Sequence, residues 1–321
     1  MKYGYYPGCS MEKNARSYHT STMAVAKPLG IEFIEVDDWN CCGATEYIAI
    51  NKIPAYALVS RNLALAADQN DSENLVAPCS ACFLNLKKVD HYLQENTELK
   101  EKVDIALDAG GLSYEPGTIN VQHLLETLSV DIGLDAIKAQ VKKPLYNLRV
   151  APYYGCLVPR PATMGSFDDP EHPTSMDKIL EVLGATVIDY PLKAQCCGGH
   201  MTQISENTAL ELIRRLLKNA QDSEADMIAT LCPMCQLNLD AYQDAVNAHF
   251  GTKFKIPIVY FTQLMGLAFD LPENELGFGK EIVSAKPALA KITEQAPKPK
   301  RTRERGKKNV GLPMPIMAEE G

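Results

Sequence analysis

The feature that most constrains this chain is a pattern of cysteines that occurs twice. The chain has 321 residues and ten cysteines, and each half carries one single cysteine, one adjacent pair and one C-x-x-C element. The gaps are 31 and 36 residues in the first half and 39 and 34 in the second. The two sets are Cys9, Cys41, Cys42, Cys79 and Cys82, and then Cys156, Cys196, Cys197, Cys232 and Cys235.

The residues around these cysteines repeat as well. YYPGC corresponds to YYGC, CCGAT to CCGGH, and CSACFLNL to CPMCQLNL. Three local similarities in the same order indicate an internal duplication. We therefore expect two similar domains, over residues 1–145 and 146–284, joined within 130–148 and followed by a basic, flexible tail over 285–321.

Short apolar strands alternate with helical patterns in both halves. We expect strands over 2–6, 32–36, 74–77, 149–154, 185–190, 227–231 and 257–261. Helices are expected over 13–27, 54–69, 83–95, 174–184 and 236–250, and another begins after Ser205. This alternation predicts an α/β fold with a small parallel sheet flanked by helices in each domain. Each cysteine motif then follows the C-terminal end of a strand, where open α/β sheets build their sites.

Charge and hydropathy argue against a nucleic-acid-binding protein and against a membrane-spanning or secreted one. The net charge is −8, yet seven Lys or Arg lie between Lys298 and Lys308, so the rest of the chain carries about −14. Such an acidic body does not suit nucleic-acid binding, which depends on neutralising phosphates. There is no apolar stretch long enough for a membrane span and no apolar core of a signal peptide near the start. We expect a cytoplasmic protein whose tail, if it has a role, docks an acidic partner.

Reduced thiols in the cytoplasm favour metal binding over disulfides. Buried free cysteines would explain one or two of the ten, but not a duplicated set. Zinc is the main structural alternative, although it takes four ligands and each half offers five. Multinuclear iron–sulfur clusters are also held by cysteine thiolates, and several iron ions neutralise five thiolates better than one divalent ion does. The fifth cysteine is then either a separate redox group or a bridge between irons.

The adjacent cysteines can reach one metal centre only from a turn, because neighbouring side chains of a strand point to opposite faces. Gly43 follows the first pair, and Gly198 and Gly199 follow the second. Their permissive backbone suits such a turn.

These motifs resemble the CCG cysteine-rich domain in tandem, and residues 1 to about 270 resemble the B-type subunits of the heterodisulfide reductase family. The resemblance implies a non-cubane 4Fe-4S cluster on the five cysteines of each half, with one cysteine bridging irons. It also implies reduction or formation of a disulfide of small thiols, within a complex that contains a ferredoxin-like iron–sulfur subunit of the C type and a flavin subunit of the A type. We expect about eight irons per chain, clusters facing each other, and substrate sulfur bound directly to iron.

The chain shows no dinucleotide loop and no ferredoxin cysteine run, so we expect no flavin or nicotinamide site here and electrons supplied by a partner. His200 is a candidate proton donor to a leaving thiolate or a hydrogen-bonded supporting residue. Arg160 is either an attractor of an anionic thiol or a surface residue, and Trp39 is expected to shield a cluster. The alternative functions are a CCG electron-transfer subunit of a respiratory complex, of the fumarate, succinate or hydroxy-acid type, and a zinc-binding scaffold.

Overall fold

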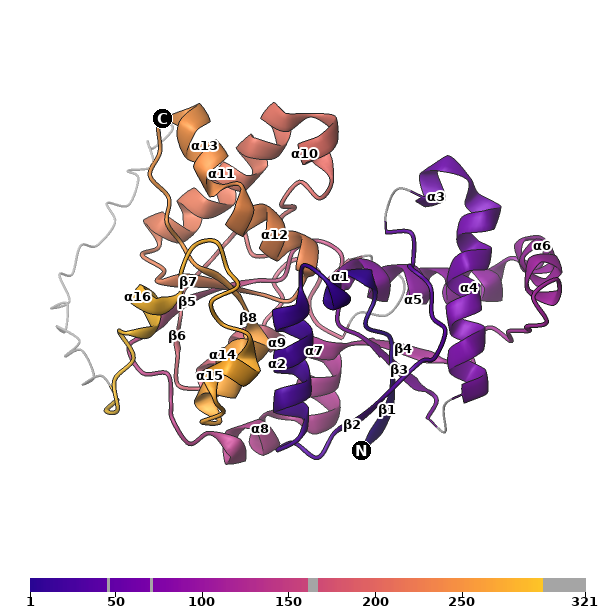
Figure 1. The fold of residues 1–321 in the computed structure, drawn as a ribbon, viewed down its shortest axis with the longest axis horizontal. Coiled ribbons are helices and arrows are strands. Elements are labelled where there is room, and N and C mark those ends of the chain that lie inside the picture. The colour runs from indigo at the N-terminus through magenta and orange to yellow at the C-terminus, as the bar shows by residue number, and fades with distance from the viewer. Residues whose placement is uncertain (45–46, 70–71, 161–166, 297–321) are drawn as a thin grey trace, which may run out of the picture.

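The computed structural model describes residues 1–44, 47–69, 72–160 and 167–296. Two four-stranded sheets, each entirely parallel, form the two halves of the molecule (Figure 1). Their orders are β2-β1-β3-β4 and β6-β5-β7-β8, so the same topology occurs twice. This confirms the expected α/β fold with two similar domains.

The strands are β1 (Lys2–Tyr5), β2 (Glu32–Glu35), β3 (Asn74–Ala77), β4 (Asn120–His123), β5 (Arg149–Tyr153), β6 (Thr186–Val187), β7 (Met227–Thr230) and β8 (Ile258–Tyr260). The helices of the first half are α1 (Cys9–Glu12), α2 (Arg16–Ala26), α3 (Tyr47–Ile50), α4 (Lys52–Gln69), α5 (Ser80–Glu95), α6 (Thr97–Asp108), α7 (Leu124–Glu126), the π-helix η1 (Thr127–Ile132) and α8 (Leu134–Gln140). Those of the second half are α9 (Ser175–Val182), α10 (Met201–Ile204), α11 (Glu206–Asp222), α12 (Pro233–Ala241), α13 (Gln243–Phe250), α14 (Phe261–Ala268), α15 (Glu273–Leu276) and α16 (Lys286–Leu289).

The central strands of both sheets are short and buried. All four residues of β7 are buried, as are Leu75, Val76 and Ala77 of β3. Near-continuous apolar runs are typical of parallel strands that are buried on both sides. Helix α11 presents an apolar stripe to the core, as its 3.6-residue pattern predicts.

Several elements differ from the expectation. Strand β4 was not expected, because its Asn120 and Gln122 make it look like polar loop. The single helix expected over 236–250 is two helices, α12 and α13, separated at Tyr242. The segment expected to link the halves contains part of η1 and all of α8, and the strand expected over 185–190 pairs only at Thr186–Val187.

The first part of the segment expected to be a flexible tail forms a short helix. Helix α16 buries Ala288, and Thr293 forms an isolated β-bridge with Tyr146. Lys291 forms an ion pair with Asp226, 2.5 Å away. The basic run from Lys298 to Lys308 lies outside the described residues.

The two halves exchange helices at their interface. Helices α14 and α15, which follow the last strand of the second sheet, pack against α2 of the first half. In the reciprocal contact, α7, η1 and α8 follow the last strand of the first sheet and pack against α9. Figure 1 shows α14 and α15 beside the indigo α2 at the centre of the molecule. A buried hydrogen bond of 2.6 Å joins the hydroxyl oxygens of Ser21 and Thr262 across this interface.

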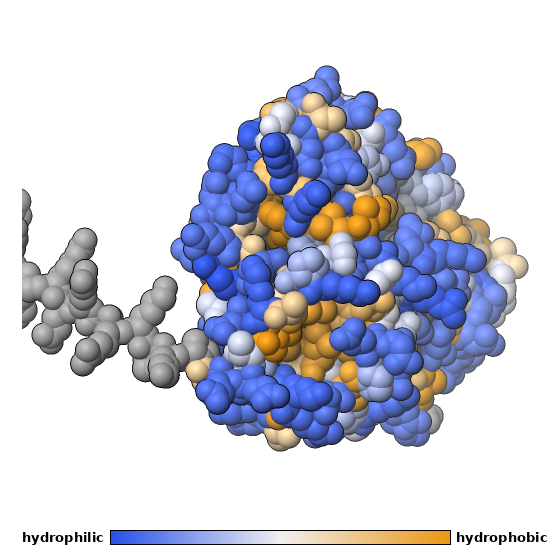
Figure 2. Space-filling view, turned by 60° about the vertical axis from the view of Figure 1, so that its left-hand side comes forward, coloured by the Kyte–Doolittle hydropathy of each residue, from blue (hydrophilic) through white to orange (hydrophobic). Residues whose placement is uncertain are grey.

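The face of the molecule seen in Figure 2 is largely hydrophilic. Its apolar residues gather in hollows between hydrophilic ridges. In the described parts of the chain, we find no helix that combines the length and the apolar character needed to cross a membrane.

Candidate metal centres

The cysteines of each half converge at the C-terminal edge of its sheet. Helix α1 begins at Cys9 just after β1, and Cys41 and Cys42 follow β2. Cys79 is the N-cap residue of α5 after β3, and Cys232 has the same position on α12 after β7. The convergence arises because all these strands are parallel and therefore end at one edge.

The sulfur atoms of the first set lie in contact without forming disulfides. Cys9 and Cys41 are 3.6 Å apart, and Cys42 and Cys82 are 3.4 Å apart, each measured between the sulfur atoms. Cys9 and Cys41 are exposed, whereas Cys42, Cys79 and Cys82 are buried. The first site therefore has one edge toward solvent and one edge inside the protein.

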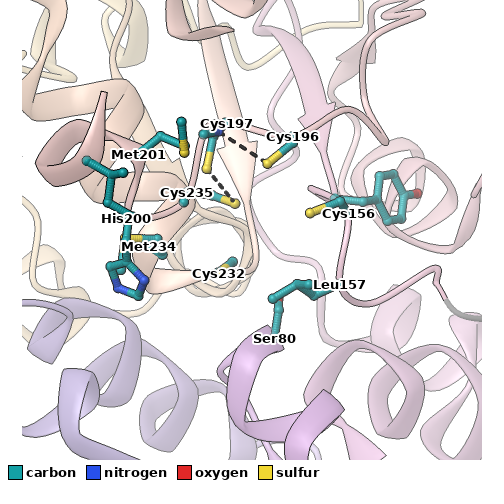
Figure 3. A pocket seen from close by; sticks show the side chains of 14 residues that line it. Ser80, Cys156, Leu157, Cys196, Cys197, His200, Met201, Cys232, Met234 and Cys235 are labelled. Carbon is teal, nitrogen blue, oxygen red and sulfur yellow. Dashed lines mark hydrogen bonds between the residues drawn. The ribbon is translucent and has the colours of Figure 1, made fainter. Parts of the chain in front are cut away.

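The second set repeats this arrangement. The sulfur atoms of Cys197 and Cys235 are 3.6 Å apart, and the amide of Gly198 donates to the Cys196 sulfur at 3.3 Å (Figure 3). Cys196 is exposed and Cys156 half-buried, and the other three cysteines are buried. The second site thus has an open edge and a buried edge like the first.

Close sulfur atoms change each other's acidity. The hydrogen bond with Cys41 and burial raise the pKa of the Cys9 thiol, while hydrogen bonds from Cys42 and Cys9 lower the pKa of Cys41 to about 2. In the second site, a hydrogen bond from Cys156 lowers the pKa of Cys196 to about 6. Neighbouring thiolates repel one another unless a cation lies between them, so both sets are suited to binding metal.

Two glycines leave room for the last cysteine of each set. A Cβ atom on Gly8 would lie 2.7 Å from the Cys82 sulfur, and one on Gly155 would lie 2.9 Å from the Cys235 sulfur. Both glycines have a positive φ, of 73° and 68°. These glycines were not expected to have a role, although each directly precedes the first cysteine of its half.

The turns after the cysteine pairs are held by one asparagine each. The Asn85 side chain donates to the carbonyl oxygens of Cys42 and Ala44, and Asn238 donates to that of Gly199 at 2.8 Å. The expected tight turn is present, with φ of 76° at Gly43, 97° at Gly198 and 53° at Gly199. The asparagines belong to the repeated motif, but their function in it was not anticipated.

The two sites meet at their buried edges. Cys232 of the second domain lies close enough to Cys79 of the first to raise the pKa of the Cys79 thiol. The neighbouring thiols of Cys235 and then Cys79 lower the pKa of Cys232. The first cysteines of the two C-x-x-C elements thus face each other across the domain interface, and we call this place the junction.

A cavity of about 290 Å³ opens at the second site, and all five of its cysteines line it. Its remaining walls are mainly apolar, with Leu157, Met201 and Met234 among them, and the described lining residues include no Lys or Arg. Figure 3 shows His200 beside Met234, on the side of the cavity opposite Cys156. Ser80 of the first domain completes the wall, and its buried hydroxyl has no hydrogen-bond partner among the described residues.

Two other residues considered from the sequence lie apart from this cavity. Arg160 forms an ion pair with Glu171 at 2.9 Å and is not among the described residues that line it. Trp39 packs edge-on against Tyr6, with ring centroids 5.4 Å apart, and Tyr6 lies within electrostatic range of Cys82, Cys42, Cys41 and Cys9. Trp39 therefore packs against Tyr6, a residue next to the first site. Its ring nitrogen donates a hydrogen bond to the carboxylate of Glu35.

The residues present fit iron–sulfur clusters. Two sets of five thiols, a glycine that keeps space beside each set, and an orphaned hydroxyl at the junction are all suited to groups that carry several metal ions and sulfides. Fold and sites together define a tandem cysteine-rich α/β protein with two adjoining thiol-rich centres.

Comparison with known proteins gives the family. The CCG cysteine-rich domain matches residues 3–87 and 150–240, and the chain belongs to this family. It is 34% identical to the 8-methylmenaquinol:fumarate reductase membrane anchor subunit of Wolinella succinogenes, over 88% of this chain and 98% of that protein. It is also 29% identical to the B-type subunit of the ferredoxin/F420H2-dependent CoB-CoM heterodisulfide reductase of Methanosarcina acetivorans, over 91% of this chain and 97% of that one.

A solved structure supports the fold alone. A hypothetical protein from Helicobacter pylori superposes with a TM-score of 0.70 at 14% identity. The alignment covers 88% of this chain and 52% of that chain, so this chain spans about half the length of that protein.

Proposed function

We propose that this chain is the iron–sulfur subunit of a multisubunit oxidoreductase of the heterodisulfide reductase type. The ten cysteines hold two non-cubane 4Fe-4S clusters, and the complex reduces or forms the disulfide of small thiols. The domains extend over residues 1–145 and 146–284, and the compartment is the cytoplasm. A ferredoxin-like subunit exchanges electrons with this chain, and through it a flavin subunit is connected.

The meeting of the two sites carries this proposal: Ser80 of the first domain, next to Cys79, lines the cavity that holds all five cysteines of the second set. Reduction of a disulfide consumes two electrons and two protons and releases two thiols. Bound clusters would supply the electrons one at a time and an iron site for sulfur. Because the two sites share an edge, one substrate can be served by both.

The chain's own residues bind and shield the substrate. Leu157, Met201 and Met234 offer apolar walls that exclude water from the second site. His200 lies beside Met234 and is assigned to deliver a proton to the departing thiolate. The C-x-x-C thiols are assigned to metal, so no cysteine acts as a free nucleophile.

Metal analysis and spectroscopy of anaerobically purified protein test this function. About eight irons and a matching amount of sulfide per chain are expected, and addition of a small thiol or disulfide should change the paramagnetic signal. Stable zinc without iron would support the scaffold alternative. A substrate adduct on Cys232 or Cys235 with unchanged cluster spectra would contradict direct binding to iron.

A second function is favoured by the composition of the cavity. Its described lining offers no Lys or Arg for an anionic thiol, and its apolar walls suit a quinol ring. The resemblance to part of a menaquinol:fumarate reductase agrees with electron transfer in a respiratory complex. Two stopped-flow experiments distinguish these functions. A small disulfide should rapidly reoxidise the reduced clusters if the chain serves a disulfide reductase. A soluble menaquinol analogue should instead rapidly reduce the oxidised clusters if the chain serves a quinol-dependent complex.

A further inference from the structure

Two buried tyrosines lie across the domain interface close to the junction. Tyr18 belongs to α2 of the first domain and Tyr260 ends β8 of the second. Their rings are stacked, with centroids 4.4 Å apart and planes 2° apart. Tyr18 is 0% and Tyr260 2% exposed, so neither phenol reaches water.

Neither hydroxyl has a hydrogen-bond partner among the described residues. A phenol placed in a protein interior usually finds one, because an unmet donor is unfavourable there. Both phenols lie within electrostatic range of Cys79 and Cys232, and burial keeps both protonated by raising their pKa. Each is therefore an O–H donor close to the sulfur-rich junction.

The edge strands β8 and β4 end at equivalent positions of the two sheets, and Tyr260 occupies this position on β8. Tyr260 pairs in register with Thr230 at the end of β8, and His123 pairs with Ala77 at the same place on β4. The duplicated fold thus ends each of these strands in a ring residue beside the C-x-x-C turn. Hydrogen bonds to cluster sulfur are among the factors that set the reduction potential of an iron–sulfur centre.

We infer that Tyr18 and Tyr260 tune the reduction potentials of the two clusters, each domain supplying one phenol that donates a hydrogen bond to a sulfide of the bound clusters. The inference rests on the proposed function, since it requires clusters on the ten cysteines. Both tyrosines would act on the sulfides of the bound clusters, because neither hydroxyl bonds to a described cysteine. One donor comes from each domain, so the potentials depend on the domains being docked.

Potentiometric titration monitored by paramagnetic resonance tests this role in the iron-loaded full chain. Tyr260→Phe and Tyr18→Phe each remove only one hydroxyl, and both should shift at least one midpoint to a more negative potential without loss of iron. The double variant should shift further. Tyr5→Phe is the matched control, because Tyr5 is equally buried but its hydroxyl pairs with His19 at 3.1 Å. Its midpoints should equal those of the wild type.

A second measurement protects the test against variants that fold poorly. Incorporation of 3-fluorotyrosine keeps the shape of the ring and strengthens the hydroxyl as a donor, so the midpoints should move to more positive potentials. Iron-loaded phenylalanine variants with the midpoints of Tyr5→Phe would overturn this inference alone. Wild-type protein without iron would overturn the proposed function, and this inference with it.

Discussion

At the scale of single residues, two glycines control the space beside the cysteines. Gly8→Ala would bring a Cβ to within 2.7 Å of the Cys82 sulfur. Real Cβ atoms do not approach so closely, and a positive φ adds strain of about 1–2 kcal/mol for any other residue. We expect Gly8→Ala to lose iron from the first site and keep it in the second, measured as iron per chain.

Gly30→Ala is the control for this prediction. Gly30 also has a positive φ, of 67°, but a Cβ there would meet nothing within 4 Å. The control should retain full iron and lose only stability. Equal iron in both variants would show that the space beside Cys82 is not needed by the metal centre.

His123 makes stability depend on pH. Burial lowers the pKa of this ring from 6.5 to about 4, and Nδ1 accepts a hydrogen bond from the amide of Leu125 at 3.0 Å. The stability from keeping the ring neutral is therefore full above pH 6.5 and is lost as the pH falls toward 4. Between pH 7.5 and 5.5 the wild type should lose about 1 kcal/mol of unfolding free energy that His123→Gln does not lose.

Denaturant unfolding of reconstituted protein at these two pH values measures the difference. His91→Gln is the control, because His91 lies near the surface beside Glu95, at 3.5 Å. If the free energy of unfolding of His123→Gln depends on pH as the wild type's does, His123 is not the source of this pH dependence.

At the scale of elements, helices α5 and α12 hold the cysteine turns as well as carrying cysteines. Asn85→Ala removes the donor to the carbonyls of Cys42 and Ala44, and Ala44 is itself held at a φ of 49°. We expect a loss of about 1–3 kcal/mol in stability and weaker iron binding at the first site, measured by unfolding and by chelator competition. The exposed Asn120, which pairs with Asn74 at 2.7 Å, provides a control whose replacement by Ala should leave iron binding unchanged.

The sequence predicted the elements that carry motifs better than those that connect them. Strand β3 and helix α11 were predicted because an apolar run and a 3.6-residue stripe report burial directly. Strand β4 was missed because its polar side chains give no apolar pattern of the kind that predicts a strand. It is an edge strand that forms by pairing with β3. The site could be anticipated as ten cysteines at strand ends, but the junction could not, because the docking of two domains leaves no periodic signal.

At the scale of the whole molecule, docking depends on close contact between α15 and α2. Gly277 ends α15 with a φ of 72°, and a Cβ there would lie 2.8 Å from both Cα and Cβ of Ser17. Gly277→Ala should therefore force the domains apart and lower the stability by about 1–3 kcal/mol beyond the backbone strain. Thermal unfolding measures this loss.

Gly279→Ala serves as its control, since Gly279 has a φ of 85° and open space around it. Only the backbone strain should appear in that variant. Equal melting temperatures for the two variants would mean that the interface accommodates the added Cβ near Ser17 without losing stability.

The exchange of helices between the halves also bears on biosynthesis. Helix α14 is synthesised long after α2, yet it covers that helix in the folded chain. Domains usually fold as they are synthesised, N-terminal first, but here the first domain must wait for the end of the second before its inner surface is closed. The buried edge of the first site, which includes Cys79, is therefore completed only after the second domain has been synthesised.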